Sequence, residues 1–263
     1  MNPGDDVQLI EDEAAAARVR IYGFLAGVFC SAPTAESAHA VSQMALTLGI
    51  SCPEGLSLGE LEREFMDLFV VPNPRYVAPY ESVYRDCWVL PPGQGRESTE
   101  QVIGRLLMGE STLQVRQAYL RAGVLPQEDL PDHIANELRF MAYLWESEAD
   151  ADGEGPASAD LRQRFCREHL LRWIGPLHER VAERDRIGFY RAALEVTEAV
   201  LRDDAAGDGG QAPPVPSDPL PRGDVTPRLS LVEGTWASPP SECGPRGCPI
   251  SGMGAGGHPV RRV

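Results

Sequence analysis

Lysine is absent from this 263-residue sequence, and all 24 of its basic side chains are arginines. A Walker A phosphate loop, a Schiff-base enzyme and a protein kinase each need a lysine amine at a fixed place in the site. The absence of lysine therefore excludes these three classes together. The sequence also contains no His-Glu-x-x-His zinc helix. We expect a protein without catalytic residues or a cofactor of its own.

Long apolar runs are missing too, since no stretch approaches the roughly 18 consecutive apolar residues that a membrane-spanning helix needs. The first 13 residues are acidic where a secretory signal peptide would be basic. We therefore expect a cytoplasmic protein with no membrane insertion. The net charge of −15 argues against nucleic acid as a partner, because phosphates bind clustered cations. It favours a basic partner or simple solubility.

Cysteine is sparse, and four of the six residues stand singly among apolar or helical neighbours, which is typical of reduced core thiols. These four are Cys30, Cys52, Cys87 and Cys166. A disulfide framework is not expected in a chain without an export signal.

Only Cys243 and Cys248 lie close together, with His258 ten residues further on. Two thiolates and one imidazole do not complete a tetrahedral zinc site, and an iron–sulfur cluster usually needs four cysteines. A metal site shared with another chain, a redox pair and an inert tail all stay open. Cys243, Cys248 and His258 are thus the candidate ligands of an alternative function, a metal- or iron–sulfur-binding redox protein.

Helical periodicity dominates residues 7–202. The segment Ala14–Phe29 is rich in helix formers, and Ile134, Leu138 and Met141 begin an apolar stripe that continues to Trp145. Further helices are expected at residues 34–49, 58–70, 98–123, 159–184 with a break at Gly175-Pro176, and 187–201. We find no convincing alternating strand pattern. The sequence predicts an all-α protein with a single helical bundle domain at residues 7–202.

Several residues are typical of helix starts. Thr34 is placed to cap the second helix, Ser98 and Gln101 fit a capping box, and Asp132 precedes the apolar stripe.

Two regions interrupt the helical pattern. Residues 71–95 hold five prolines and several aromatic side chains, and a loop of that length inside a helical domain is often functional. From residue 203 onward, Pro and Gly make up 22 of 61 residues, which predicts a flexible tail over 203–263.

Polar side chains in the middle of the chain have two interpretations. His133 and Glu137 share a helix face, with Asp132 before them. They form either an ordinary helix start with His133 exposed, or a polar cluster that accepts hydrogen bonds from a bound peptide. A nucleophile scheme with Ser82, Glu81 and His133 is a third and weaker alternative.

Three short motifs, in order, resemble the TorD/DmsD/NarJ chaperones of molybdoenzymes. The first is Glu64-Phe-Met-Asp-Leu-Phe-Val-Val-Pro-Asn-Pro-Arg75, running into Pro79-Tyr-Glu-Ser-Val-Tyr84. The second is Pro131-Asp-His-Ile-Ala-Asn-Glu-Leu-Arg-Phe-Met141, and the third is His169-Leu-x-x-Trp173 followed by Phe189-Tyr190. The resemblance covers about residues 10–202, and the Cys-bearing tail lies outside it.

The resemblance implies a system-specific cytoplasmic chaperone. Such a protein binds the twin-arginine signal peptide, or another segment, of the apo-form of a molybdenum-cofactor oxidoreductase subunit, assists cofactor insertion and prevents premature export. The tail suggests a subgroup that serves type II enzymes of the dimethyl sulfoxide reductase family. The client itself, and whether the chaperone is a monomer or a homodimer, stay open.

The resemblance, with the chemistry of the neighbouring aromatic residues, also implies a peptide-binding surface. Carboxylates pair with guanidinium groups, and aromatic rings offer apolar faces to a hydrophobic signal segment. The residues concerned are Tyr80, Glu81, Ser82, Tyr84, Trp88, Asp132, His133 and Glu137.

Overall fold

The computed structural model describes residues 3–90, 101–105, 107–126, 130–149, 155–206 and 229–231. Its helices are α1 (Pro3–Cys30), α2 (Ala35–Thr47), α3 (Leu58–Phe65), α4 (Glu81–Arg85), α5 (Glu110–Arg121), α6 (Ile134–Ala149), α7 (Gly155–Phe165), α8 (Leu171–Ala182) and α9 (Phe189–Ala206). Two π-helical segments, η1 (Met66–Val70) and η2 (Cys166–Leu170), extend α3 and join α7 to α8. The short strands are β1 (Cys87–Leu90), β2 (Gln101–Arg105), β3 (Val124–Pro126) and β4 (Leu229–Leu231).

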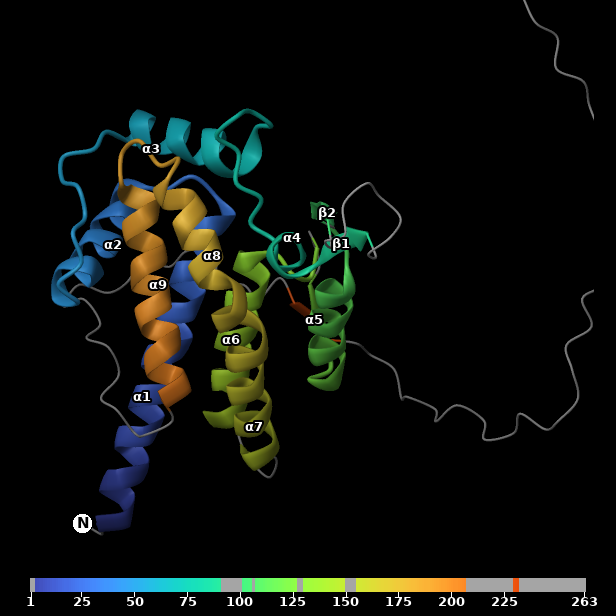
Figure 1. Cartoon of the computed structure of the whole chain (residues 1–263). Helices are drawn as coiled ribbons and strands as arrows, with labels where there is room; N and C mark the ends of the chain where they lie inside the picture. Colours follow the sequence, from blue (N-terminus) through green and yellow to red (C-terminus); the bar gives the residue numbers. More distant parts are fainter. Residues whose placement is uncertain are drawn as a thin grey trace, which may run out of the picture. The chain divides into compact units, whose positions relative to one another are not determined.

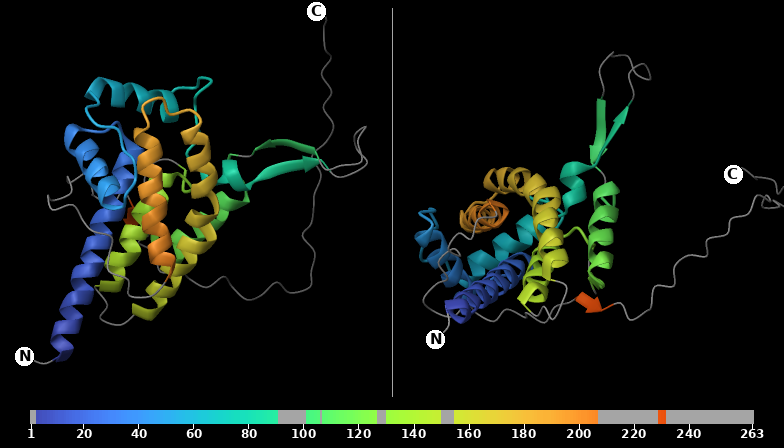
Figure 2. Two further views of the ribbon diagram at one scale, coloured as in Figure 1. Left: turned by 60° about the vertical axis from the view of Figure 1, so that its left-hand side comes forward. Right: turned by 90° about the horizontal axis from the view of Figure 1, so that it is seen from below.

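The helices form a bundle, so the all-α prediction is confirmed. Helix α1 packs along α6, α9 packs against α8 and α2, and α6 also contacts α7. Figure 1 shows α3 lying across one end of this bundle, and Figure 2 shows β1 and β2 projecting away from it. None of the helices in the described part of the chain has the length and apolarity needed to cross a membrane.

The core follows the apolar periodicity of the sequence. In α1, Ile21, Leu25 and Phe29 recur about one turn apart and are buried. In α6, Ile134 and Leu138 begin the expected stripe with no exposed surface. The predicted stripe of α6 is confirmed, because burial against neighbouring helices requires the same spacing that makes it visible in the sequence.

Helix starts are set by local side-chain bonds. The Thr34 hydroxyl accepts a hydrogen bond from the Ser37 N–H at 3.1 Å, which confirms the predicted cap of α2. An equivalent box joins Ser57 and Glu60 at α3. At α9, Asp185 Oδ1 accepts from the N–H of Gly188 at 2.8 Å. Each cap satisfies donors that have no partner within the helix.

The predicted helix at residues 98–123 is wrong in its first half. Residues Gln101–Arg105 form β2, which pairs antiparallel with β1 in the register Cys87↔Arg105 and Leu90↔Gln101. Among the described residues of this range only α5 is helical, and it begins after Met108, whose φ of 64° interrupts any regular helix. Backbone pairing with β1 therefore places Gln101 in a strand, and Ser98, the other residue of the expected capping box, lies outside the described residues. The expected loop at 71–95 correspondingly contains α4 and β1.

The predicted break at Gly175-Pro176 is also wrong. Helix α8 continues through Pro176, although proline cannot donate to the carbonyl of residue 172. The irregular turn lies upstream, where η2 adds a π-helical segment between α7 and α8. Burial of Trp173, Ile174 and Leu177 holds α8 together across the missing bond.

Helix α9 runs to Ala206, past the boundary expected at residue 202. Asp204 is buried there, and its Oδ2 accepts hydrogen bonds from the Tyr22 hydroxyl at 2.6 Å and the Trp145 Nε1–H at 2.9 Å. Arg18 forms ion pairs with both Asp203 and Asp204. Burial, and then the charge of Asp204, raises the pKa of Tyr22 well above its ordinary value. Asp204 therefore joins α1, α6 and α9.

The rest of the C-terminal region is described only at β4, which pairs antiparallel with β3 in the register Val124↔Leu231. Cys243, Cys248 and His258 lie outside the described residues. Cys30, Cys52 and Cys166 are not disulfide-bonded.

We predict that Asp204→Ala lowers the free energy of unfolding by about 3–5 kcal/mol, because it leaves the buried Arg18 guanidinium without its buried partner. Urea unfolding followed by circular dichroism measures this loss. The control is Glu195→Ala, which removes an exposed carboxylate from the same helix. Equal midpoints for the two variants would contradict the assignment of Asp204 as a joint between helices.

We also predict that a chain ending at Ala206 folds with wild-type helicity, whereas a chain ending at Arg202 does not. The shorter chain loses both carboxylates that pair with Arg18. Circular dichroism and melting temperature compare the two truncations directly. A longer chain that is insoluble would show that residues beyond 206 are needed by the helical domain.

Candidate functional site

The first two motifs meet through their backbones. Tyr80 and His133 form an isolated antiparallel bridge. The Glu81 N–H donates to the Asp132 carbonyl at 2.9 Å, and the Ile134 N–H donates to the Pro79 carbonyl at 3.0 Å. The start of α4 is thereby fixed against the start of α6, and the side chains of both motifs point into one region.

Asp132 does not cap α6 as expected. Its Oδ2 accepts a hydrogen bond from the Ser82 N–H at 3.0 Å, so it supports the first turn of α4 instead. At α6, His133 Nδ1 accepts from the Ala135 N–H at 3.1 Å, which leaves the proton of a neutral ring on Nε2. The His133 imidazole therefore caps α6, which is the role that the sequence predicted for the Asp132 carboxylate.

Glu81 has a buried carboxyl group with two basic neighbours. Its side chain has no exposed surface, and Arg85 forms an ion pair with it one turn further along α4. His169 on η2 places Nδ1 3.0 Å from Oε2 of the same carboxylate. Arg85 also donates to the Glu168 carbonyl at 2.9 Å. These bonds join α4 to η2.

Glu137 lies beside Glu81 inside the fold. The Trp173 Nε1–H donates to its Oε2 at 3.1 Å, whereas its Oε1 accepts no hydrogen bond from the described residues. Burial, followed by the negative charge of Glu81, raises the pKa of Glu137 well above 4.5. A protonated Glu137 satisfies this geometry, because it can donate to the Glu81 carboxylate.

Aromatic rings cover the outer side of this group. Tyr84 stacks on Trp173 with ring centroids 5.5 Å apart, and the Arg180 guanidinium lies over Tyr84. Tyr80 meets His133 edge to face at 5.1 Å. Tyr80 and Tyr84 are half-buried. Trp88 lies on β1, and its side chain is outside the described part of the structure.

The structure thus brings seven of the eight expected residues together, mostly as a buried polar cluster rather than an exposed surface. Glu81, Ser82, Asp132 and Glu137 have no exposed surface, and His133 is 9% exposed. Their contribution to peptide binding stays a prediction. The Ser82 Oγ has no hydrogen-bond partner among the described residues, so it has no base to activate it.

Sequence reasoning did not assign His169, Trp173 and Arg85 to this cluster. His169 and Trp173 were visible as the third motif, and their spacing placed both on one side of a helix. Arg85 follows Glu81 by four residues, which is the spacing of a helical ion pair. The long separation of 88 residues between Glu81 and His169 hid their contact.

The first motif also has a structural role. Arg75 forms ion pairs with Glu64 and Asp67, and it donates to the Arg184 carbonyl. Asn73 Nδ2 donates to the carbonyls of Asp67 and Val71 at 2.8 Å each. These bonds hold the segment between η1 and α4 against the α8–α9 connection.

A sequence model of the nitrate reductase delta subunit family matches residues 31–179, which is more than half of the chain. The chain belongs to this family. The matched range contains the first two motifs and the His169–Trp173 part of the third, so the resemblance to the TorD/DmsD/NarJ group is confirmed.

Curated relatives carry the name chaperone protein TorD. One from Vibrio cholerae serotype O1 (strain ATCC 39541) is 31% identical over 150 residues, which cover 55% of this chain and 60% of the relative. One from Shewanella pealeana is 28% identical over 152 residues, covering 57% and 61%. The match therefore spans about 60% of the length of these relatives.

We predict that Glu137→Gln flattens the dependence of stability on pH. A carboxyl whose pKa is raised on folding keeps its proton in the native state, while the unfolded chain releases that proton above about pH 4.5. The stabilisation is complete below that pH and is lost as pH rises towards the folded-state pKa, by at most about 1.4 kcal/mol per pH unit. Glutamine carries no titrating proton.

The measurement is urea unfolding of both proteins from about pH 5 to about pH 8. The exposed Glu195→Gln serves as the control. Parallel stability curves for the wild type and Glu137→Gln would show that Glu137 does not retain a proton in the fold.

Proposed function

We propose that this chain is a maturation chaperone for a molybdenum-cofactor oxidoreductase and not an enzyme. It acts in the cytoplasm on the apo-form of the catalytic subunit, binds the twin-arginine signal peptide or another segment, and holds the subunit until the cofactor is inserted. Export of an incomplete enzyme is thereby prevented. The observation that carries the proposal is membership of the delta subunit family together with relatives named as chaperones.

The geometry supports binding rather than catalysis. The polar residues of the motifs are engaged in holding α4, α6 and η2 together, as the bonds of Asp132 and Glu81 show. No group of three or more His, Cys, Asp or Glu side chains in the described residues is arranged to hold a metal ion. A chaperone needs a defined surface for its client, which a rigid interior of this kind can present.

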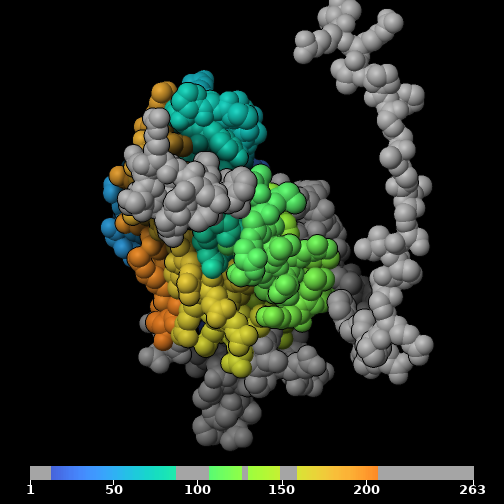
Figure 3. All heavy atoms as spheres, turned by 45° about the vertical axis from the view of Figure 1, so that its right-hand side comes forward, coloured from blue at the N-terminus to red at the C-terminus, as the bar shows by residue number. Residues whose placement is uncertain are grey.

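We place the signal-peptide contact on the surface of α3 and η1. Leu58, Met66 and Val70 lie on this surface at multiples of four residues and are exposed, and Val71 extends the apolar area. Exposed Glu62 accompanies them, together with Glu60, which also bonds to Ser57, and Asp67, which also pairs with Arg75. Figure 3 shows this part of the molecule open to solvent. We call it the α3–η1 surface.

This surface has the chemistry of a signal-peptide site. A twin-arginine leader combines two guanidinium groups with an apolar segment. Carboxylates bind guanidinium groups by paired, charge-assisted hydrogen bonds, and an exposed apolar strip binds the hydrophobic part. The net charge of −15 also attracts a basic leader over a distance, more weakly at high salt.

We predict that tagged protein expressed in its native host captures the catalytic subunit of a molybdoenzyme with its leader still attached. Mass spectrometry of the captured material identifies the subunit and its N-terminus. Recovery of no such subunit, while the enzyme is being produced, would overturn the proposal. It would direct attention to metal analysis of the Cys243 and Cys248 region.

The double variant Met66→Ser, Val70→Ser tests the α3–η1 surface in the same assay. Loss of two exposed apolar anchors should weaken capture roughly tenfold. Leu46→Ser, which changes an exposed leucine on α2, is the matched control and should capture normally. Equal capture by the wild type, the double variant and the control would show that the client does not bind the α3–η1 surface. The chaperone assignment would be unaffected.

A further inference from the structure

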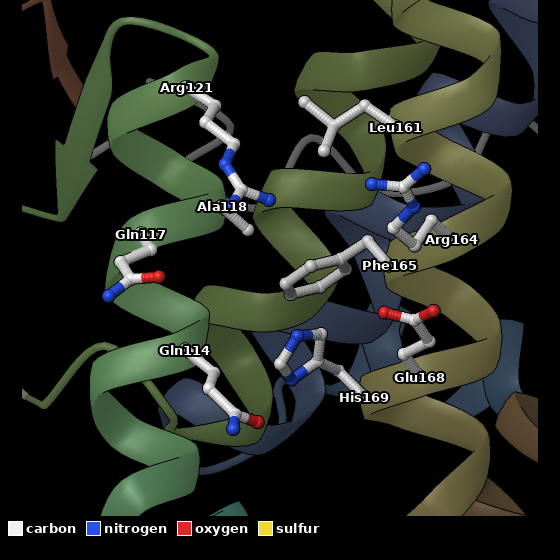
Figure 4. Close-up of a pocket in the computed structure, with 9 residues that line it drawn as sticks. All are labelled: Gln114, Gln117, Ala118, Arg121, Leu161, Arg164, Phe165, Glu168 and His169. Carbon is white, nitrogen blue, oxygen red and sulfur yellow. The ribbon is translucent and has the colours of Figure 1, made fainter.

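A pocket of about 230 Å³ lies between α5 and the α7–η2 segment, away from the α3–η1 surface. Figure 4 shows that α5 forms one wall and α7 with η2 forms the other. Phe165 lies between the walls and is buried, because its ring packs against Tyr119 and Phe140. The pocket therefore has a rigid aromatic floor.

Two guanidinium groups converge on this pocket from opposite walls. Arg121 on α5 and Arg164 on α7 both point towards it in Figure 4. Neither forms an ion pair within the described part of the chain, whereas the neighbouring Arg162 is paired with Glu148. In a protein of net charge −15, two unpaired cations that face one pocket indicate a site for an anion.

The remaining polar groups limit the kind of anion. Glu168 lines the same pocket, so the two arginines and this carboxylate together leave one positive charge. Gln114 and Gln117 on α5 offer amide groups that both donate and accept hydrogen bonds, as a peptide bond requires. A singly charged group attached to a peptide matches this lining better than a doubly charged phosphate.

His169 connects the pocket with the buried polar cluster. It lines the pocket and stacks on Phe165 with ring centroids 4.8 Å apart, while its Nδ1 faces the Glu81 carboxylate. Nδ1 of the His169 ring therefore contacts Glu81 in the interior, while another edge of the same ring lines the pocket. A carboxylate bound there would meet a polar ring whose orientation Glu81 fixes.

We propose that this pocket binds the carboxylate of an Asp or Glu side chain in the polypeptide that the protein holds. Arg121 and Arg164 bind the carboxylate from the two walls, Gln114 and Gln117 bind the adjoining peptide bonds, and Phe165 contacts the side-chain methylenes. The inference rests on the proposed function for the identity of the partner. It assigns this protein a second contact, selective for an acidic residue.

The test uses capped peptides, acetyl-Gly-Glu-Gly-amide and its Gln-containing match, with inorganic phosphate as a third probe. Side-chain NMR signals of Arg and Gln in the full-length protein are followed during titration. We expect saturable shifts with the Glu peptide that are absent with the Gln peptide. Arg121→Gln and Arg164→Gln should each weaken binding about tenfold, the loss of one charge-assisted bond.

Arg172→Gln is the matched control, since Arg172 is an exposed arginine on α8 that does not line the pocket. It should bind like the wild type. Equal shifts with the Glu and Gln peptides, or unchanged binding in both pocket variants, would overturn the carboxylate site. Tighter binding of phosphate than of the Glu peptide would also overturn it and would assign the pocket to a phosphorylated ligand.

The capture assay separates this inference from the proposed function. If the double variant Arg121→Gln, Arg164→Gln no longer binds the Glu peptide and also captures less client, the carboxylate site and the proposed function are both supported. If the wild type binds the Glu peptide but captures no molybdoenzyme subunit, the pocket stands and the proposed client is wrong. If peptide binding fails while capture succeeds, the chaperone assignment stands without the pocket.

Discussion

The burial of the Glu81 carboxyl group imposes the strictest constraint on the middle of this molecule. A carboxylate removed from water is stable only when nearby cations and hydrogen-bond donors replace the lost solvent. Arg85 comes from its own helix and His169 from η2, while Glu137 contributes a carboxyl whose raised pKa favours the protonated form. Helix α4 therefore cannot separate from η2 without losing the Glu81–His169 contact and the bond from Arg85 to the Glu168 carbonyl. The aromatic packing of Tyr84 on Trp173 depends on the same placement.

This constraint gives the family motifs a physical meaning. The first motif supplies Glu81 and the Arg75 network, the second supplies Asp132 and Glu137, and the third supplies His169 and Trp173. Because residues of the three motifs bond to one another across the bundle, they hold the helices in one arrangement. The proposed specificity for one client then has to come from side chains outside the buried cluster, on the exposed faces that the cluster holds in position.

The parts of the fold that the sequence predicts are those fixed by neighbours in the chain. The apolar stripe of α6 and the Thr34 cap each depend on residues within a few turns, and both are confirmed. The helix predicted at 98–123 fails because β2 pairs with β1, a contact that no local pattern records. The burial of Glu81 is equally hidden from the sequence, because it involves His169, 88 residues away, and the part of these residues in peptide binding stays a prediction. Charged residues are usually exposed, and only the folded structure shows which one has partners.

Charge illustrates the difference between a whole-chain property and a local one. The net charge of −15 describes attraction over distances comparable with the screening length, and it favours the approach of a basic polypeptide. Within contact distance the field is set by the few groups that line each surface. Acidic residues accompany the exposed apolar side chains of α3 and η1, whereas Arg121 and Arg164 face each other across the α5–α7 pocket. A protein that binds its partner through both proposed surfaces would discriminate by the arrangement of charges along that partner, because a uniformly basic segment would satisfy only the acidic α3–η1 surface.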